Sequence, residues 1–192
     1  MKILKLLPIV IMVLFAQNAN AQGLGPDAGA KIPHDLSLMA TSGQVENLDS
    51  LKSENGIALF FVRSVDWCPY CKTQAKEVNE RAQDFLDRGI TPVLISYDDP
   101  QIQKDFFDKE GFSVPLLADV GSVVIKEFGI LNDSTSPESK YYGYPHPIVF
   151  LISPDGVIKN KLYVESDTIV NGSSYKERPE IDAILEAIDA MD

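Results

Sequence analysis

The sequence IALFFVRSVDWCPYCK, residues 57–72, joins a continuous apolar run to the only two cysteines of this 192-residue chain. Cys68 and Cys71 are separated by two residues, and a segment with helical periodicity follows them. A buried strand, a C-x-x-C pair and a helix in this order are typical of a redox-active dithiol. We therefore predict that the two sulfurs open and close a small-ring disulfide.

Two simpler interpretations of the cysteines are weaker. A purely structural disulfide between Cys68 and Cys71 would close a loop of only two intervening residues, and the stabilisation from a disulfide grows with loop length. A metal site requires about four ligands. His34 and His146, the remaining soft ligands, do not have the spacing of a zinc motif. We expect no metal.

The helix that follows the cysteines predicts how they divide the chemistry. Cys68 falls at the helix N-terminus, where free N–H groups and the helix dipole stabilise a thiolate. Pro69 fits the first helical position, because no helical hydrogen bond is lost there. Cys71 belongs to the inner stripe of the helix. We therefore expect Cys68 to be accessible and to attack, and Cys71 to resolve the product.

Neighbouring side chains are expected to shape this site. Trp67 is interpreted as a packing platform beside the sulfurs, and Tyr70 lies between them in sequence. Lys72 is either a nearby positive charge or a solvated surface lysine, and the sequence leaves both open.

Strand and helix patterns alternate along the rest of the chain. We predict a hairpin around Thr41-Ser42-Gly43, a short helix over 49–54, one helical stripe from Cys71 to Phe85, and a helix opened by Asp99-Pro100. Further strands are expected over 57–62, 92–96, 114–118, 148–152 and 157–164, and further helices over 122–128 and from Pro179. This order predicts an α/β fold with a central mixed sheet flanked by helices.

The first residues have the pattern of an export signal. Lys2 and Lys5 precede the apolar stretch 6–16, which is too short to span a bilayer of about 30 Å. Ala19-Asn20-Ala21 has the small-x-small pattern of a cleavage site. We therefore expect cleavage after Ala21 and a periplasmic or secreted protein.

The expected domain organisation follows from this boundary. Residues 1–21 are assigned to the signal peptide, 22–34 to a flexible leader rich in Gly, Ala and Pro, and 35–192 to one domain. The formal net charge of −11 argues against nucleic acid and anionic membranes as partners. No Gly-rich phosphate loop follows a predicted strand, so we expect no nucleotide, and we expect no other cofactor.

Pro147 and His146 come directly before the strand predicted over 148–152. X-Pro bonds tolerate the cis form, but a trans proline at the first residue of a strand is also common. His146 titrates near neutrality and is a candidate proton donor, although a histidine in a loop is often only structural.

Residues 66–72 resemble the active-site segment of the thioredoxin superfamily, and the whole chain resembles the exported redoxins of the alkyl hydroperoxide reductase/thiol-specific antioxidant family. The supporting stretches are residues 44–51, 114–119 and 147–156. The resemblance implies a thioredoxin-like fold with an N-terminal hairpin. It also implies that Cys68 attacks, that Cys71 resolves, and that Pro147 is the superfamily's cis proline.

The sequence departs from the patterns of both subfamilies that the resemblance suggests, the peroxidases and the thioredoxins. In the Pro-x-x-x-Thr/Ser-x-x-Cys motif of a peroxidase, the chain has Phe61 and Val65 in place of the Pro and the Thr/Ser. Arg63 is the only arginine near the cysteines in sequence, so the donors for a leaving oxide are not evident. The acidic residue that thioredoxins carry before the site is replaced by Val62.

Three hypotheses follow from these residues. The first is an exported thiol-disulfide oxidoreductase that acts on protein thiols or disulfides and is itself reduced by an unidentified partner. The alternative is a peroxiredoxin-like antioxidant enzyme that reduces small hydroperoxides with the same two cysteines. The third is a redox-inactive binding domain.

Overall fold

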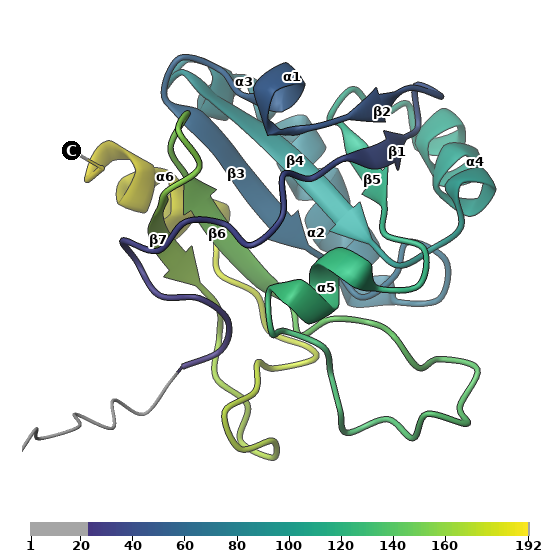
Figure 1. Ribbon diagram of the computed structural model, residues 1–192. Coiled ribbons are helices and arrows are strands. Elements are labelled where there is room, and N and C mark those ends of the chain that lie inside the picture. Colours follow the sequence, from purple (N-terminus) through teal and green to yellow (C-terminus); the bar gives the residue numbers. More distant parts are fainter. Residues whose placement is uncertain (1–22, 192) are drawn as a thin grey trace, which may run out of the picture.

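Seven strands form a single mixed sheet in the computed structural model, which describes residues 23–191 (Figure 1). In sheet order the strands are β2 (Val45–Glu46), β1 (Leu38–Ala40), β5 (Leu116–Ala118), β4 (Ile90–Ser96), β3 (Gly56–Phe61), β6 (Ile148–Ile152) and β7 (Ile158–Leu162). The predicted signal peptide lies outside the described residues.

The central strand β3 is parallel to β4 and antiparallel to β6. Its residues are all buried, which explains the continuous apolar run in the sequence. Ala58 and Phe60 contribute to the core on one face of the sheet, whereas Ile57, Leu59 and Phe61 contribute to the core on the other.

Helices cover both faces of the sheet. One face packs against α2 (Pro69–Glu80), α3 (Ala82–Leu86), α4 (Pro100–Glu110) and α6 (Ile181–Asp189). The other face packs against α1 (Leu48–Leu51) and α5 (Val123–Glu127), and α5 crosses the front of the sheet in Figure 1. The predicted α/β fold with a mixed sheet and an N-terminal hairpin is confirmed.

Two details of the helices differ from the sequence pattern. The single stripe expected from Cys71 to Phe85 is divided at Arg81, whose φ of −100° and ψ of 12° end α2 and start α3. In α4, the apolar Ile102 is exposed, whereas the polar Gln103 is fully buried. Gln103 takes that place because its amide nitrogen donates to the Leu117 carbonyl at 2.7 Å.

The segment expected to be a flexible leader lies along β7. Backbone hydrogen bonds join Gly29 to Ile158 and Ile32 to Gly156, and Leu24 is buried in the core. Lys161 Nζ donates to the carbonyls of Leu24 and Gly25. The folded unit of this chain therefore begins before residue 35, because these contacts cover an edge of the sheet.

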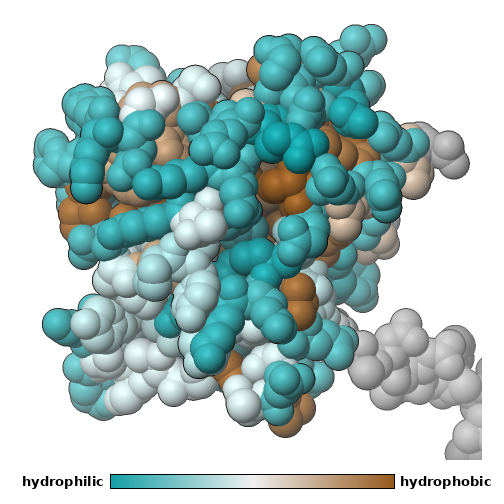
Figure 2. All heavy atoms as spheres, turned by 180° about the vertical axis from the view of Figure 1, so that it is seen from behind, coloured by the Kyte–Doolittle hydropathy of each residue, from teal (hydrophilic) through white to brown (hydrophobic). Residues whose placement is uncertain are grey.

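The face of the molecule opposite to that of Figure 1 is mostly polar. Seen from behind, hydrophilic side chains cover most of the face, and apolar groups gather only in small separate patches (Figure 2). Between residues 23 and 191, no helix is both long enough and apolar enough to cross a membrane.

Candidate active site

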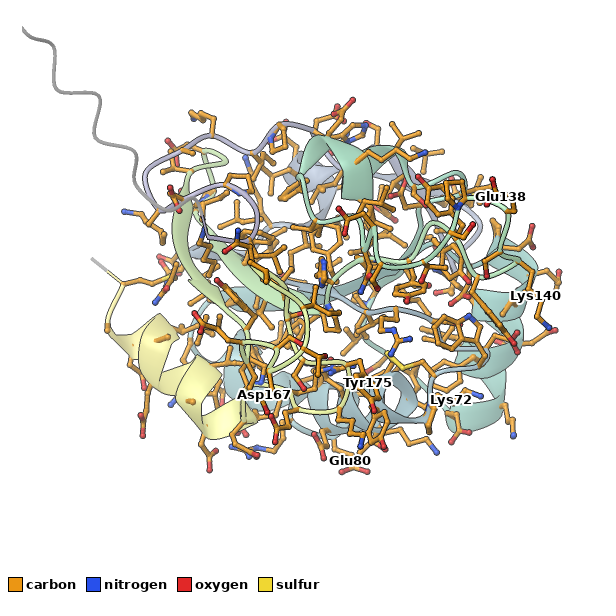
Figure 3. All side chains as sticks on the ribbon, turned by 90° about the horizontal axis from the view of Figure 1, so that it is seen from below. Lys72, Glu80, Glu138, Lys140, Asp167 and Tyr175 are labelled. Atoms are coloured by element: carbon orange, nitrogen blue, oxygen red, sulfur yellow. A yellow bond between two sulfur atoms is a disulfide. The ribbon has the colours of Figure 1, made fainter. Side chains whose placement is uncertain are left out.

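Several segments meet where β3 and β4 end. Residues 62–68 leave β3 there and enter α2, and Tyr97 and Asp98 follow β4. Because β6 is antiparallel to β3 with Ile148 opposite Phe61, the residues just before β6 reach the same edge. Figure 3 looks onto this end of the molecule, with Tyr175 and, to its right, Lys72 in the lower half of the view.

The two cysteines form a disulfide across the first turn of α2. Cys68 is the N-cap residue, and its Sγ accepts a hydrogen bond from the Cys71 amide at 3.3 Å. Pro69 is the first helical residue, as predicted. The helix N-terminus therefore supplies both an N–H group and its dipole to the Cys68 sulfur.

The expected accessibility of Cys68 is wrong for this disulfide form. Cys68 is 1% exposed and Cys71 is fully buried, and both belong to the core that contains Val65 and Ala75. The sequence places Cys68 at the start of a helix, but it does not reveal that the neighbouring loops cover that start.

A buried carboxylate holds the loop before Cys68 in place. Asp98 accepts hydrogen bonds from the Ser64 hydroxyl and the Val65 amide, both at 2.7 Å, and from the Ser96 hydroxyl at 2.8 Å. Burial raises the pKa of Asp98, and these hydrogen bonds oppose the shift. The Ser64 hydroxyl oxygen in turn accepts hydrogen bonds from the amides of Asp66 and Trp67. The Asp98 carboxylate therefore holds the whole turn in place, directly or through Ser64.

Arg178 brings a positive charge to the sulfurs from the far end of the sequence. Its Nη2 lies 3.6 Å from Cys71 Sγ, and its Nε donates to Gln74 Oε1 at 3.2 Å. Burial, reinforced by the charge of Arg63, lowers the pKa of Arg178 to about 10. The guanidinium is therefore still charged at neutral pH.

Arg63 lies among aromatic rings. Its guanidinium carbon is 4.8 Å from the ring centre of Trp67, 4.6 Å from that of Tyr144 and 5.9 Å from that of Tyr175. These distances are those of cation–π contacts. The expectation that charged donors are missing from the site is thus corrected, because two arginines converge on it.

Trp67 and Tyr70 take different positions around the disulfide. Trp67 donates from Nε1 to the Tyr97 hydroxyl at 3.0 Å, and its ring contacts those of Tyr141 and Tyr144 edge to face. Tyr70 is 41% exposed, and its ring contacts that of Tyr175. Trp67 is therefore part of the wall of the site, and Tyr70 lies on its outer surface.

Pro147 and His146 reach the edge of the sheet beside the cysteine loop, but neither has the geometry that was expected. Pro147 is buried and trans, since the described chain contains no cis peptide bond. His146 Nδ1 accepts a hydrogen bond from the Ser173 amide at 3.3 Å, and burial lowers the pKa of the imidazole. His146 fastens the loop of residues 165–175 to the site.

Sequence reasoning missed Asp98 and the role of Arg178. Asp98 had a detectable signal, because it is an acidic residue two positions after a buried strand whose parallel neighbour leads to the cysteines. Arg178 gave no such signal in the sequence, since it lies 107 positions after Cys71. Among residues 23–191, no group of side chains has the composition of a metal site.

The fold and the buried C-x-x-C disulfide at a helix N-terminus define a thioredoxin-fold redoxin. Residues 28–161 match the AhpC/TSA family. This chain belongs to that family, and its class is that of an oxidoreductase working through cysteine thiols.

Individual relatives agree with this assignment. The chain is 26% identical over 137 residues to Peroxiredoxin Bcp of Escherichia coli, a match covering 71% of this chain and 86% of that protein. It is also 26% identical over 175 residues to the 1-Cys peroxiredoxin PER1 of Hordeum vulgare, covering 87% and 73% of the two chains.

A solved structure confirms the fold independently. The chain superposes on Peroxidoxin BcpB of Mycobacterium tuberculosis with a TM-score of 0.70 at 22% identity. The superposition covers 86% of this chain and 98% of the other.

Proposed function

We propose that this protein is a thiol-dependent peroxidase that reduces small hydroperoxides with Cys68 and Cys71. The observation that carries the proposal is the position of the Arg178 guanidinium, 3.6 Å from Cys71 Sγ in a buried dithiol site. A fixed positive charge in a poorly hydrated site stabilises both a thiolate and the oxide that leaves a peroxide.

Burial of the sulfurs supports a small substrate. A folded protein disulfide needs an exposed sulfur for in-line attack, whereas Cys68 is 1% exposed. A hydroperoxide group is only two heavy atoms long and needs a much smaller opening. The relatives named above carry peroxiredoxin names, which agrees with this choice.

The proposed reaction proceeds in two steps. The Cys68 thiolate attacks the terminal peroxide oxygen, the O–O bond breaks, and the alkoxide leaves and takes up a proton, so that Cys68 becomes a sulfenic acid. The Cys71 thiolate then attacks the Cys68 sulfur, and hydroxide leaves as water after protonation. The resulting disulfide is returned to two thiols by a small external dithiol, which supplies the two electrons and needs less room at the buried sulfurs than a folded protein would.

Thiol-disulfide exchange is the second candidate, and one observation favours it. Tyr70 and Tyr175 are about half exposed beside the cysteines and offer aromatic contacts to an extended polypeptide. Export to the periplasm or the exterior, inferred from residues 1–21, would suit either activity. We keep that location as part of the proposal.

The test compares the two activities on the same samples. The full chain, Cys68→Ser and Cys71→Ser are assayed for hydrogen peroxide consumption with dithiothreitol and for reduction of insulin disulfides. We expect peroxide consumption by the wild type, none by Cys68→Ser, and a trapped sulfenic acid at Cys68 in Cys71→Ser. Insulin reduction without peroxide consumption would replace the proposal with the second candidate, and neither activity would leave a redox-inactive binding domain.

Arg178→Gln tests the observation that carries the proposal. Loss of a charged donor from such a site lowers the second-order rate constant with peroxide about 100-fold. Arg81→Gln is the matched control, because Arg81 pairs with Asp182 on the surface and should leave that rate constant within about 2-fold. Equal rate constants for the two variants would remove Arg178 from the chemistry.

A further inference from the structure

A surface cavity of about 470 Å³ opens beside the cysteine loop. Its walls are Arg63, the rings of Trp67, Tyr141 and Tyr144, and the hydroxyl-bearing residues Ser134, Thr135, Ser136 and Ser139. This volume lies in the range of small-molecule sites and is far larger than hydrogen peroxide requires. The proposed reaction does not use this cavity.

Arg63 has a positive charge that nothing in the described chain neutralises. Its contacts are with aromatic rings, its Nε is buried without a hydrogen-bond partner, and no carboxylate of residues 23–191 forms an ion pair with it. A second guanidinium, that of Arg178, lies close enough for the charge of Arg63 to lower the pKa of Arg178. Arg63 lines the cavity and Arg178 does not, but the charge of Arg178 adds to the positive potential beside it. An unneutralised guanidinium in the wall of a cavity favours an anion there.

The remaining walls indicate what accompanies the anion. The ring of Trp67 contacts those of Tyr141 and Tyr144 edge to face, and all three rings line the cavity. Tyr144 also shares a 2.6 Å hydrogen bond with Thr135 Oγ1, which fixes the ring. Lys140 lies 4.8 Å from the ring centre of Tyr141 and projects from the outer edge of the long loop, where it adds a third positive charge (Figure 3).

We propose that Arg63 and this cavity bind the carboxylate of a small aromatic molecule, and that the substrates preferred by the enzyme are organic hydroperoxides bearing such a group. Trp67 connects the two sites, since it forms a wall of the cavity and directly precedes Cys68. The proposed binding of an aromatic carboxylate depends only on the cavity, whereas the proposed substrate preference also rests on the proposed peroxidase function. The bonds made and broken are those described above.

Direct binding is tested with a probe that cannot react. Trp67 is the only tryptophan of the chain, so tryptophan fluorescence, excited where tyrosine does not absorb, reports on the cavity wall. The oxidised full chain is titrated with 4-(2-hydroxypropan-2-yl)benzoate, the alcohol that a carboxylated cumene hydroperoxide would yield, and with neutral 2-phenyl-2-propanol. We expect saturable binding of the benzoate at least about 10-fold tighter than that of the neutral alcohol.

Variants assign the binding to Arg63. Arg63→Gln should weaken benzoate binding about 10- to 100-fold, as expected when a charge-assisted contact is lost, and Arg63→Lys should recover part of it. Lys104→Gln removes the same charge from α4 far along the surface and should bind as the wild type does. Equal affinities of the wild type for the two alcohols, or an unchanged affinity in Arg63→Gln, would overturn the binding site.

The substrate preference is measured separately. The wild type should have a kcat/KM for the para-carboxylate of cumene hydroperoxide at least about 10-fold above that for cumene hydroperoxide, and Arg63→Gln should reduce this ratio to near one. Turnover of both peroxides at equal kcat/KM by the wild type would refute the preference and leave the peroxidase function intact. Failure to consume any peroxide, with benzoate binding retained, would refute the proposed function and leave the binding site standing.

Discussion

At the level of single residues, buried polar side chains hold the loop before the disulfide in place and bring a positive charge to its sulfurs. Asp98 organises the turn before Cys68, and Arg178 contacts Cys71. His146 has a different role from the proton donor that its position suggested. Its Nδ1 accepts from a backbone amide, which requires the neutral ring.

Burial of the His146 ring makes the stability of the protein depend on pH. Burial lowers the pKa of His146 in the folded state, so the unfolded chain binds the proton more readily. Its contribution to stability is therefore complete above the unfolded pKa of about 6.5 and is lost as pH falls below that value. We expect the free energy of unfolding to decrease between pH 7 and pH 5, and His146→Leu to flatten that part of the profile.

The matched control uses the other histidine. His34→Gln leaves the buried ring in place and should keep the slope of the wild type. Urea unfolding at closely spaced pH values measures all three proteins. A slope that is the same in His146→Leu and in the wild type would contradict this account.

At the level of the elements, backbone geometry explains why the strands meet as they do. Gly56 opens β3 with a φ of +113°, and a Cβ there would lie 1.9 Å from the Ile152 carbonyl oxygen of β6. Gly111 ends α4 with a φ of +68°, but a Cβ there would meet open space. Both glycines have a positive φ, but they differ in its value and in the room around them.

That difference predicts two different costs. Gly111→Ala should destabilise the protein by about 1 to 2 kcal/mol, which is the cost of a left-handed residue with a Cβ. Gly56→Ala should cost more than about 3 kcal/mol, because the overlap with β6 adds to the backbone strain. Chemical unfolding of both variants measures the difference, and equal losses would mean that β6 shifts away without resistance.

At the level of the whole molecule, segments far apart in sequence complete the fold. Residues 23–34 cover the edge at β7, and residues 165–178 bring Tyr175 and Arg178 to the cysteines. Figure 1 shows the N-terminal segment running beside β7, at the opposite edge of the sheet from β1 and β2.

Removal of the N-terminal segment should therefore weaken the entire fold. A chain that starts at residue 35 loses the buried Leu24 side chain and the backbone hydrogen bonds to β7. We expect a loss of at least about 3 kcal/mol relative to a chain that starts at residue 23, together with aggregation through the uncovered edge. Leu24→Ala in the longer chain separates the contribution of burial, about 2 to 3 kcal/mol.

Urea unfolding and light scattering check both parts of this prediction. Equal midpoints and equal solubility of the two chains would show that residues 23–34 are a leader after all, as their composition suggests.

Local pattern sufficed to predict the disulfide pair, the N-cap position of Cys68, the helix start at Asp99-Pro100 and the mixed sheet. In each case the cause lies within a few residues: a helix dipole, a fixed proline φ, or the alternation of apolar residues along a strand. The resemblance to the AhpC/TSA family then extended these local signals to the fold as a whole.

Only the tertiary structure revealed the burial of Cys68, the approach of Arg178, the isolated charge of Arg63 and the packing of residues 23–34. These features depend on which loops meet at one edge of the sheet, and sequence spacing carries no information about contacts that span more than a hundred residues. The exposure of a sulfur and the neutralisation of a charge are set by whatever lies beside them in space. The sequence thus determined which groups can react, and the folded chain decided what surrounds them.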